Sequence, residues 1–335
     1  MARYDFASDN VAGAMPEVIE SVGRFNGGFE AGYGNDGVGK RAADLIRGLL
    51  DTDAEVWFVA SGTAANALAL ATLAAPHEAV LAHEHAHVAT DETGAPGFFG
   101  AGLGIIPLPG ASGRIDPSAL TKALVRPEEA HWQSPAALSV TQATEFGAVY
   151  GGDDLATLAH QAKANGVRLH LDGARLANAV SAGFDIKSVA RLGVDIAVIG
   201  GTKAGSTPTE ALVLFDKSLR HRFGARLKHG GQLISKARFL SAPWIGMLEG
   251  GAWTRRAAHA NAMAQRLAGL MPFPITHEVQ ANGVFTIMDE AALERLRRAG
   301  WFVYRFIDGS VRFMCSWATT PEAVDELGAA LRAVR

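Results

Sequence analysis

Two polar residues that could do chemistry stand directly after strand-like stretches of the sequence. Asp172 follows the apolar run 167–171, and Lys203 follows the apolar run 194–199 after a Gly-Gly-Thr turn. About one helix with its turns separates the two runs, which predicts a βαβ unit with parallel strands. Because ligands bind beyond the carboxyl ends of the strands in open α/β sheets, we expect Asp172 and Lys203 to face one pocket.

A carboxylate held near such a lysine is the arrangement that a pyridoxal phosphate enzyme needs. Lys203 would form a Schiff base with the cofactor, and Asp172 would keep the pyridine nitrogen protonated so that the ring accepts electrons. The plainer interpretation is structural, because an Asp at a strand end often caps a helix and a Lys after a glycine-rich turn is often a solvated loop residue. Further motifs are therefore needed to decide.

A small-residue turn early in the chain is suited to holding a phosphate. The strand-like run 55–59 leads into Ser61, Gly62 and Thr63, and an alanine-rich helix follows. The backbone N–H groups and the positive end of that helix would point at one anion. Many helices begin this way, so the turn predicts a phosphate site only in combination with Lys203.

Three histidines, His83, His85 and His87, follow the strand-like run 79–82 with one residue between neighbours. On an extended segment they would line one face, as metal ligands can, so a metallohydrolase is the alternative from a different class of enzyme. No second histidine cluster follows at a matching distance. We therefore expect no metal site, and we expect one of these imidazoles to stack on a cofactor ring.

The glycine-rich stretch 34–40 has the first part of a phosphate-binding P-loop, GxxxxGK. However, Arg41 stands where the Ser or Thr that holds magnesium should be, and no strand-like run precedes the loop. We interpret the stretch instead as a surface loop that exposes Tyr33 and leads into an amphipathic helix at 38–50.

The composition is that of a well-buried globular enzyme and excludes several other classes. Hydrophobic residues make up 48% and charged residues 19% of the 335-residue chain, and the net charge of −3 provides no basic surface for nucleic acid. The longest apolar run, 67–75, is too short to span a bilayer. A single cysteine, Cys315, excludes an intramolecular disulfide, and we expect a cytoplasmic location.

The order of the predicted elements indicates an α/β fold with two domains. Residues 1–245 would form a large cofactor-binding domain around a mainly parallel sheet, and residues 246–335 a smaller α+β domain. In the large domain we predict further strands at 137–140 and 211–214, a helix at 153–165 and a loop at 97–104. In the small domain we predict helices at 252–270, 291–299 and 321–333 and strands at 275–279, 284–288, 302–307 and 311–315.

Together the motifs resemble those of the L-threonine aldolases, which have the aspartate-aminotransferase-like fold (fold type I) of pyridoxal phosphate enzymes. The matching motifs, in order along most of the chain, are Ser8-Asp9-Asn10, Tyr33-Gly34-Asn35-Asp36, Ser61-Gly62-Thr63-Ala64-Ala65-Asn66, Asp172-Gly173-Ala174-Arg175 and Gly201-Thr202-Lys203. Each is short, but their order and spacing together are specific. The Gly-Gly-Thr-Lys form and the Thr-Gln-Ala-Thr stretch resemble the low-specificity bacterial branch.

The resemblance implies that the protein cleaves L-threonine, L-allo-threonine and related β-hydroxy-α-amino acids to glycine and an aldehyde. It implies catalytic roles for Lys203, His87 and Asp172, with His87 stacking on the ring of pyridoxal phosphate. The implied cofactor-binding residues are these three together with Ser61, Gly62, Thr63, Arg175 and Thr202. The implied substrate-binding residues are Ser8, Tyr33, His85, Thr144, Arg175 and Arg312.

The resemblance also concerns the assembly and the catalytic base. Tyr33 would reach into the pocket of a neighbouring subunit, which implies at least a dimer, and we expect a homotetramer. Many family members have a second active-site histidine near the position where this chain has Thr144 and Glu145. His87, His85 and an ordered water therefore all remain candidates for the base.

Two further points stay open. Arg226, Lys228 and Lys236 are candidates for a basic residue that reaches the phosphate from a neighbouring subunit. The alternative activities are those of another fold type I lyase, acting by β-elimination or on aryl-serines such as phenylserine. A catalytically silent homologue that serves as a binding module is the remaining alternative.

Overall fold

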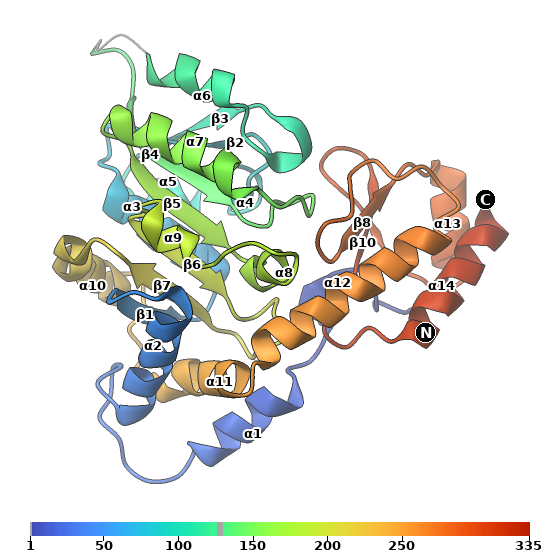
Figure 1. Cartoon of the computed structure of the whole chain (residues 1–335), viewed down its shortest axis with the longest axis horizontal. Coiled ribbons are helices and arrows are strands. Elements are labelled where there is room, and N and C mark those ends of the chain that lie inside the picture. The colour runs from blue at the N-terminus through green and yellow to red at the C-terminus, as the bar shows by residue number, and fades with distance from the viewer. Residues whose placement is uncertain (1, 126–129) are drawn as a thin grey trace.

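The computed structural model describes residues 2–125 and 130–335 of the chain (Figure 1). Its main sheet has seven strands in the order β1-β7-β6-β5-β4-β2-β3. These are β1 (Glu55–Val59), β2 (Glu78–His83), β3 (Gly104–Leu108), β4 (Ser134–Thr141), β5 (Arg168–Gly173), β6 (Ile196–Gly200) and β7 (Glu210–Leu214). The strands from β3 across to β6 pair in parallel, and β7 is antiparallel to both β6 and β1. The predicted mainly parallel sheet is therefore confirmed.

This sheet is buried on both faces. All residues of β6 and β7 are buried, and the alternating residues of β6 belong to two separate core clusters. One face is covered by α3 (Gly62–Leu73) and α10 (Arg220–His229), and the other by α7 (Gly152–Ala164) and α8 (Leu176–Ser181). Continuous apolar strands are typical of parallel sheets that helices cover on both sides, because neither face meets water.

The central βαβ unit forms with a different connection from the one expected. β5 and β6 are adjacent and parallel, as predicted. Two short helices, α8 and α9 (Ser188–Arg191), connect them in place of a single helix. Gly183, with φ of 102°, follows α8 and allows the chain to turn there.

One edge of the sheet differs from the prediction. The predicted loop 97–104 contains the end of a short helix, α5 (Ala95–Phe99), and the first residue of strand β3, which the prediction missed. The loop prediction is therefore wrong at both of its ends. β3 contains a proline, Pro107, which has no backbone N–H to donate. An edge strand tolerates this, because it pairs with a neighbouring strand on one side only.

Three helices pack together beside β1. They are α1 (Pro16–Arg24), α2 (Gly37–Leu50) and α11 (Arg238–Glu249), which lie next to one another in Figure 1. The amphipathic helix predicted at 38–50 is thus α2, whose first turn is capped by the Asp36 carboxylate. Three shorter helices lie away from this group: α4 (His87–Thr90) and α5 contact α3, and α6 (Pro117–Leu124) contacts α7.

A second, antiparallel sheet lies towards the C-terminus, in the orange and red part of Figure 1. It has the order β8-β10-β9, formed by Gly283–Thr286, Val311–Met314 and Tyr304–Arg305. Helices α12 (Ala252–Leu270), α13 (Glu290–Arg298) and α14 (Pro321–Val334) pack with it around one apolar cluster. The predicted strand 275–279 is wrong: among the described residues its only bridge joins Ile275 to Thr286, and Ile275 is 39% exposed.

The N-terminal segment joins this second sheet. Phe6 belongs to its apolar cluster, and the Met314 N–H donates to the Phe6 carbonyl over 2.9 Å. α11 continues through residue 245, where the sequence suggested a boundary, so the division into two domains stays a prediction. Within residues 2–125 and 130–335, no helix is long and apolar enough to cross a membrane.

Candidate active site

A cavity of about 550 Å³ lies at the carboxyl ends of β4, β5 and β6. The N-terminus of α3, the start of α4 and Arg312 on β10 form further parts of its wall. The predicted site residues that line it are Ser8, Ser61, Gly62, Thr63, His85, His87, Asp172, Arg175, Thr202, Lys203 and Arg312. Two predicted site residues, Tyr33 and Thr144, do not line it.

The strand pairing brings Asp172 and Lys203 to the same cavity. Asp172 pairs with Val198 in the register of β5 with β6, and Lys203 follows the end of β6 by three residues. The turn between the end of β6 and Lys203 needs glycine, because a Cβ at Gly201 would lie 2.4 Å from the carbonyl oxygen of Thr209. The expectation that the two residues face one pocket is therefore confirmed.

The amine of Lys203 is in an environment that favours its neutral form. Burial lowers the pKa of Lys203, and the nearby charge of Arg175 lowers it further. A lysine with a lowered pKa is a better nucleophile at neutral pH. Beside it, the Glu210 carboxylate accepts a hydrogen bond from the Gly201 N–H over 2.7 Å, and burial raises the pKa of Glu210 to about 7.

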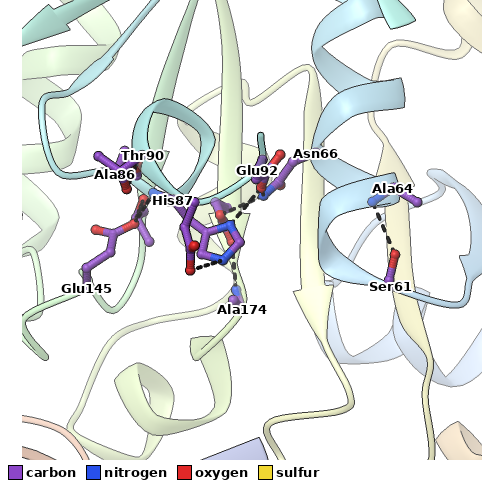
Figure 2. A network of polar contacts seen from close by, with 12 residues as sticks. Ser61, Ala64, Asn66, Ala86, His87, Thr90, Glu92, Glu145 and Ala174 are labelled. Carbon is purple, nitrogen blue, oxygen red and sulfur yellow. Dashed lines mark hydrogen bonds and ion pairs between the residues drawn. The ribbon is translucent and has the colours of Figure 1, made fainter. Parts of the chain in front are cut away.

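Asp172 is held by a buried polar network that extends to His87. Figure 2 shows Asn66, Glu92 and His87 in this network. Asp172 Oδ1 accepts from the Ala174 N–H over 3.0 Å, and Asp172 Oδ2 accepts from Asn66 Nδ2 over 2.9 Å. The same Asn66 Nδ2 donates to Glu92 Oε1 over 2.8 Å, and Glu92 Oε1 pairs with His87 Nδ1 over 2.9 Å. The prediction of site residues included neither Asn66 nor Glu92, although Asn66 ends the Ser61–Asn66 motif.

The charges in this network depend on one another. The hydrogen bond to Glu92 raises the pKa of His87, while burial acts in the opposite direction. Burial raises the pKa of Glu92, and the nearby charge of Asp172 adds to that effect. The charge of Asp172 thus affects the protonation of Glu92, and the charge of Glu92 affects the protonation of His87.

A second buried pair, Arg175 with Asp9, also lies near Lys203. Arg175 Nε donates to Asp9 Oδ2 over 2.6 Å, and Arg175 Nη2 donates to Asp9 Oδ1 over 2.9 Å. Asn282 Nδ2 also donates to Asp9 Oδ2, over 3.1 Å. Burial would raise the pKa of Asp9, but the Arg175 guanidinium outweighs it and holds that pKa at about 2. Asp9 was missed as a site residue, and its position in the Ser8-Asp9-Asn10 motif is the signal that pointed to it.

Arg312 presents a guanidinium to the cavity with no carboxylate paired to it among the described residues. Its Nε is buried without a hydrogen-bond partner in that part of the chain, and its Cζ lies 4.7 Å from the centre of the Phe306 ring. Burial lowers the pKa of Arg312 to about 10, and repulsion from Arg175 contributes to this shift. An anionic group bound in the cavity would relieve both penalties.

The N-terminus of α3 forms another part of the cavity wall. The Ser61 hydroxyl accepts from the Ala64 N–H over 3.3 Å, which caps the helix. Gly62 and Thr63, the first two helical residues, line the cavity, and a Cβ at Gly62 would meet nothing within 4 Å. Free N–H groups at the positive end of a helix are suited to a phosphate.

The stretch after β4 requires a correction. Thr144 is fully buried, and its hydroxyl donates to the Ser112 carbonyl over 2.7 Å and accepts from the Ala148 N–H over 3.1 Å. It therefore holds a turn and is not placed to bind substrate. Glu145 lines the cavity instead, accepting from the His87 backbone N–H over 2.9 Å and from the Thr141 hydroxyl over 3.1 Å. Burial raises the pKa of Glu145.

The three histidines do not form one ligand face. His83 ends β2, where its Nε2 donates to the Gly110 carbonyl over 3.0 Å and its Nδ1 accepts from the His85 N–H over 3.0 Å. His87 begins helix α4, so the segment is not extended as the metal-site hypothesis required. Among the described residues, no group of three or more His, Cys, Asp or Glu residues could hold a metal ion.

Tyr33 lies outside the cavity of its own chain. Its side chain is half exposed, and the ring is 4.9 Å from Lys228 Nζ. Its φ of 60° places its backbone in the left-handed region, which is uncommon for a residue other than glycine. The role of Tyr33 in a neighbouring subunit stays a prediction.

Comparison with known proteins gives consistent matches along the whole chain. Residues 5–291 match the family model described as Beta-eliminating lyase. The low-specificity L-threonine aldolase of Pseudomonas sp. (strain NCIMB 10558) is 44% identical over 98% of this chain and 97% of that protein. The enzyme of the same name from Pseudomonas aeruginosa is 43% identical, again over 98% of this chain and 97% of its own length.

Solved structures match the fold. The threonine aldolase of Leishmania major superposes with a TM-score of 0.93 at 29% identity, covering 99% of this chain and 100% of that one. An alanine–glyoxylate aminotransferase from Nostoc sp. has a TM-score of 0.72 at 17% identity, covering 100% and 95% of the two chains. The second match concerns the fold alone.

Proposed function

The chain belongs to the beta-eliminating lyase family, and from that premise we propose that it is a pyridoxal-phosphate-dependent aldolase. Its proposed substrates are L-threonine, L-allo-threonine and related β-hydroxy-α-amino acids, which it cleaves to glycine and an aldehyde. The observation that carries this proposal is the placement of Lys203 and Asp172 in one cavity, two parts of whose wall are suited to binding an anion. One part is the N-terminus of α3, and the other is Arg312.

The residues of the cavity fit the cofactor. The Lys203 amine, whose pKa is lowered, suits the covalent attachment, and the buried Asp172 carboxylate suits a protonated pyridine nitrogen. The start of α3 suits the phosphate, and His87 lines the cavity where a ring could stack. When bound, pyridoxal phosphate takes up the electrons of the bond that breaks at the substrate Cα.

We assign the substrate carboxylate to Arg312, with Ser8 and Arg175 beside it. Arg175 Nε and Nη2 already donate to Asp9, whereas Arg312 has no carboxylate partner among the described residues. Holding the carboxylate fixes rotation about the Cα bonds and decides which of them stands perpendicular to the cofactor ring. Orientation of this kind suppresses loss of the α-proton or of the carboxylate, which would lead to other products.

The β-hydroxyl proton needs an acceptor, and two imidazoles, His85 and His87, line the cavity. Removal of this proton by a side chain contributes about 10²–10⁴-fold in rate. His87→Phe keeps a ring that can stack but cannot accept a proton, so we expect a loss of that size if His87 is the base. Activity near that of the wild type would exclude His87, and His85→Phe is the matched variant.

The decisive experiment combines a spectrum with product analysis. The purified protein should carry visible absorbance that changes on addition of glycine, and Lys203→Ala should abolish it. L-threonine should give glycine and acetaldehyde in equal amounts. Release of ammonia and a keto acid would instead identify a β-eliminating lyase, and a Lys203→Ala protein with full turnover would refute the proposal.

We further propose a homo-oligomer, at least a dimer and in the expected form a tetramer, in which Tyr33 reaches the cavity of a neighbour. Mixing Tyr33→Ala with Lys203→Ala protein under conditions that exchange subunits should restore activity, because a hybrid dimer contains one cavity with both native residues. Unmixed variants are the controls. No recovery, with exchange verified by mass, would show that each chain forms its site alone. The cytoplasmic location and the division near residue 245 stay predictions.

A further inference from the structure

Two buried residues of the site have no role in the reaction described so far. Asn66 lies on α3, a helix otherwise made of small and apolar residues and threonines, and Glu92 follows α4. Their side chains are almost completely buried, at 3% and 4% exposure. A polar side chain in such a place is costly unless its hydrogen bonds are made, so both residues need an explanation.

Their hydrogen bonds form one continuous line (Figure 2). It runs from His87 Nδ1 to Glu92 Oε1 over 2.9 Å, from that oxygen to Asn66 Nδ2 over 2.8 Å, and from Asn66 Nδ2 to Asp172 Oδ2 over 2.9 Å. A single amide nitrogen therefore uses its two protons on two different carboxyl groups. Glu92 and Asp172 are brought close together, and Asn66 screens the repulsion between them.

We propose that Glu92 and Asn66 are positioning residues that link the imidazole of His87 to the carboxylate of Asp172, so that the charge of one depends on that of the other. The link itself follows from the contacts. Its use in the reaction rests on the proposed function, in which Asp172 meets the cofactor nitrogen and His87 meets its ring. A proton gained or lost at His87 would then alter how strongly the cofactor draws electrons.

The surroundings of His87 leave Glu92 as its main anionic partner. Asp91 Oδ2 lies 3.6 Å from His87 Nε2, but the Asp91 side chain is 84% exposed and water weakens its effect. Glu145 contacts the backbone N–H of His87 and not the ring. Lys203 opposes a positive charge on His87, whereas Glu92 and Asp172 favour it, in agreement with the raised pKa of His87.

The first test is a titration of the His87 ring by NMR in the full-length protein with its cofactor. Glu92→Gln keeps the shape and a hydrogen-bond acceptor but removes the charge, so the pKa of His87 should fall. Asp91→Asn is the matched control, because it removes an exposed carboxylate from the same ring and should leave the titration nearly unchanged. An unchanged titration in Glu92→Gln, or an equal shift in both variants, would overturn the proposal.

The second test asks whether Asn66 transmits the effect. Asp172→Asn should lower the pKa of His87 in the native background, and should lower it by less in an Asn66→Ala background. Equal shifts in the two backgrounds would show that Asn66 only fills space. If Asn66→Ala does not fold, Asn66→Ser makes the same comparison, because one hydroxyl proton cannot serve both carboxyl groups.

The outcomes separate this inference from the proposed function. If threonine is not cleaved, the titration still decides whether the four residues are linked. If the titration shows no link, threonine cleavage stands without it. Cofactor affinity is a further readout. Asn66→Ala should weaken cofactor binding by about 10-fold, because Asp172 loses the hydrogen bond from Asn66. Asp308→Asn, which alters the separate His277–Asp308 pair, should leave cofactor affinity unchanged.

Discussion

Replacing Asp9 by asparagine would remove a buried negative charge while keeping the size of the side chain. Asp9 is 2% exposed and accepts hydrogen bonds from Arg175 Nε and Nη2, over 2.6 and 2.9 Å. In the variant, one of these guanidinium N–H groups would face an amide N–H and would lose its acceptor. Arg175 would also lose the carboxylate that is hydrogen-bonded to its buried charge.

The loss can be worked out in two ways. Pairing with Arg175 brings the pKa of Asp9 from 3.8 to about 2, and this difference corresponds to about 2.5 kcal/mol of stability at neutral pH. Breaking a buried ion pair by removing one partner costs about 3–5 kcal/mol, because the remaining charge is uncompensated. We therefore expect Asp9→Asn to lower the free energy of unfolding by about 2.5–5 kcal/mol at pH 7.

The pH dependence has a defined sign. Because the pKa of Asp9 is lower in the folded state than in the unfolded state, its contribution is complete above pH 3.8 and is lost as the pH falls towards about 2. Urea unfolding at a series of pH values should show the wild-type protein losing this contribution within that range. In Asp9→Asn this part of the acid dependence should be absent. The difference in free energy of unfolding between the two proteins should therefore become smaller as the pH falls.

An exposed pair of the same geometry provides the control. Arg266 and Asp325 also form two hydrogen bonds, over 2.8 and 2.6 Å, but on the surface. Asp325→Asn should change stability little, because water already solvates both charges. The reasoning would be refuted if the free energies of unfolding of Asp9→Asn and the wild type fell in parallel below about pH 4. It would also be refuted if Asp9→Asn destabilised the protein no more than Asp325→Asn does.

Three further predictions use other parts of the structure. Arg312→Met should lower kcat/KM for threonine by about 10–100-fold and leave cofactor binding intact, because it removes a charged hydrogen-bond donor from the substrate carboxylate. His170 is buried, its Nε2 has no hydrogen-bond partner among the described residues, and burial lowers its pKa to about 4. In urea unfolding, the free energy of unfolding of the wild type should therefore fall by up to about 3 kcal/mol between pH 6.5 and about 4, whereas that of His170→Leu should not. Gly201→Ala should destabilise the protein by about 1–3 kcal/mol in thermal unfolding and lower cofactor content, because the added Cβ would meet the Thr209 carbonyl at 2.4 Å.

Local patterns in the sequence were sufficient for most elements. The apolar repeat at 252–270 predicted α12 with the bounds that the structure has, and the run 55–59 predicted β1 in the same way. The weak points were short or edge elements. β3 was missed because a proline and two flanking glycine-rich turns hide its apolar run, and 275–279 has strand-like residues but forms a single bridge.

By itself, the sequence determined that Asp172 and Lys203 lie together, because parallel strands place their carboxyl ends at one edge of a sheet. Only the tertiary structure decided which partners these residues have. The bonds from Asn66 to Glu92 and to Asp172 cross 26 and 106 positions, and the bond from Arg175 to Asp9 crosses 166. The hydrophobic periodicity of a sequence predicts whether a side chain is buried. A hydrogen bond depends instead on which distant segment packs against that side chain, so these three pairs can be identified only in the folded chain.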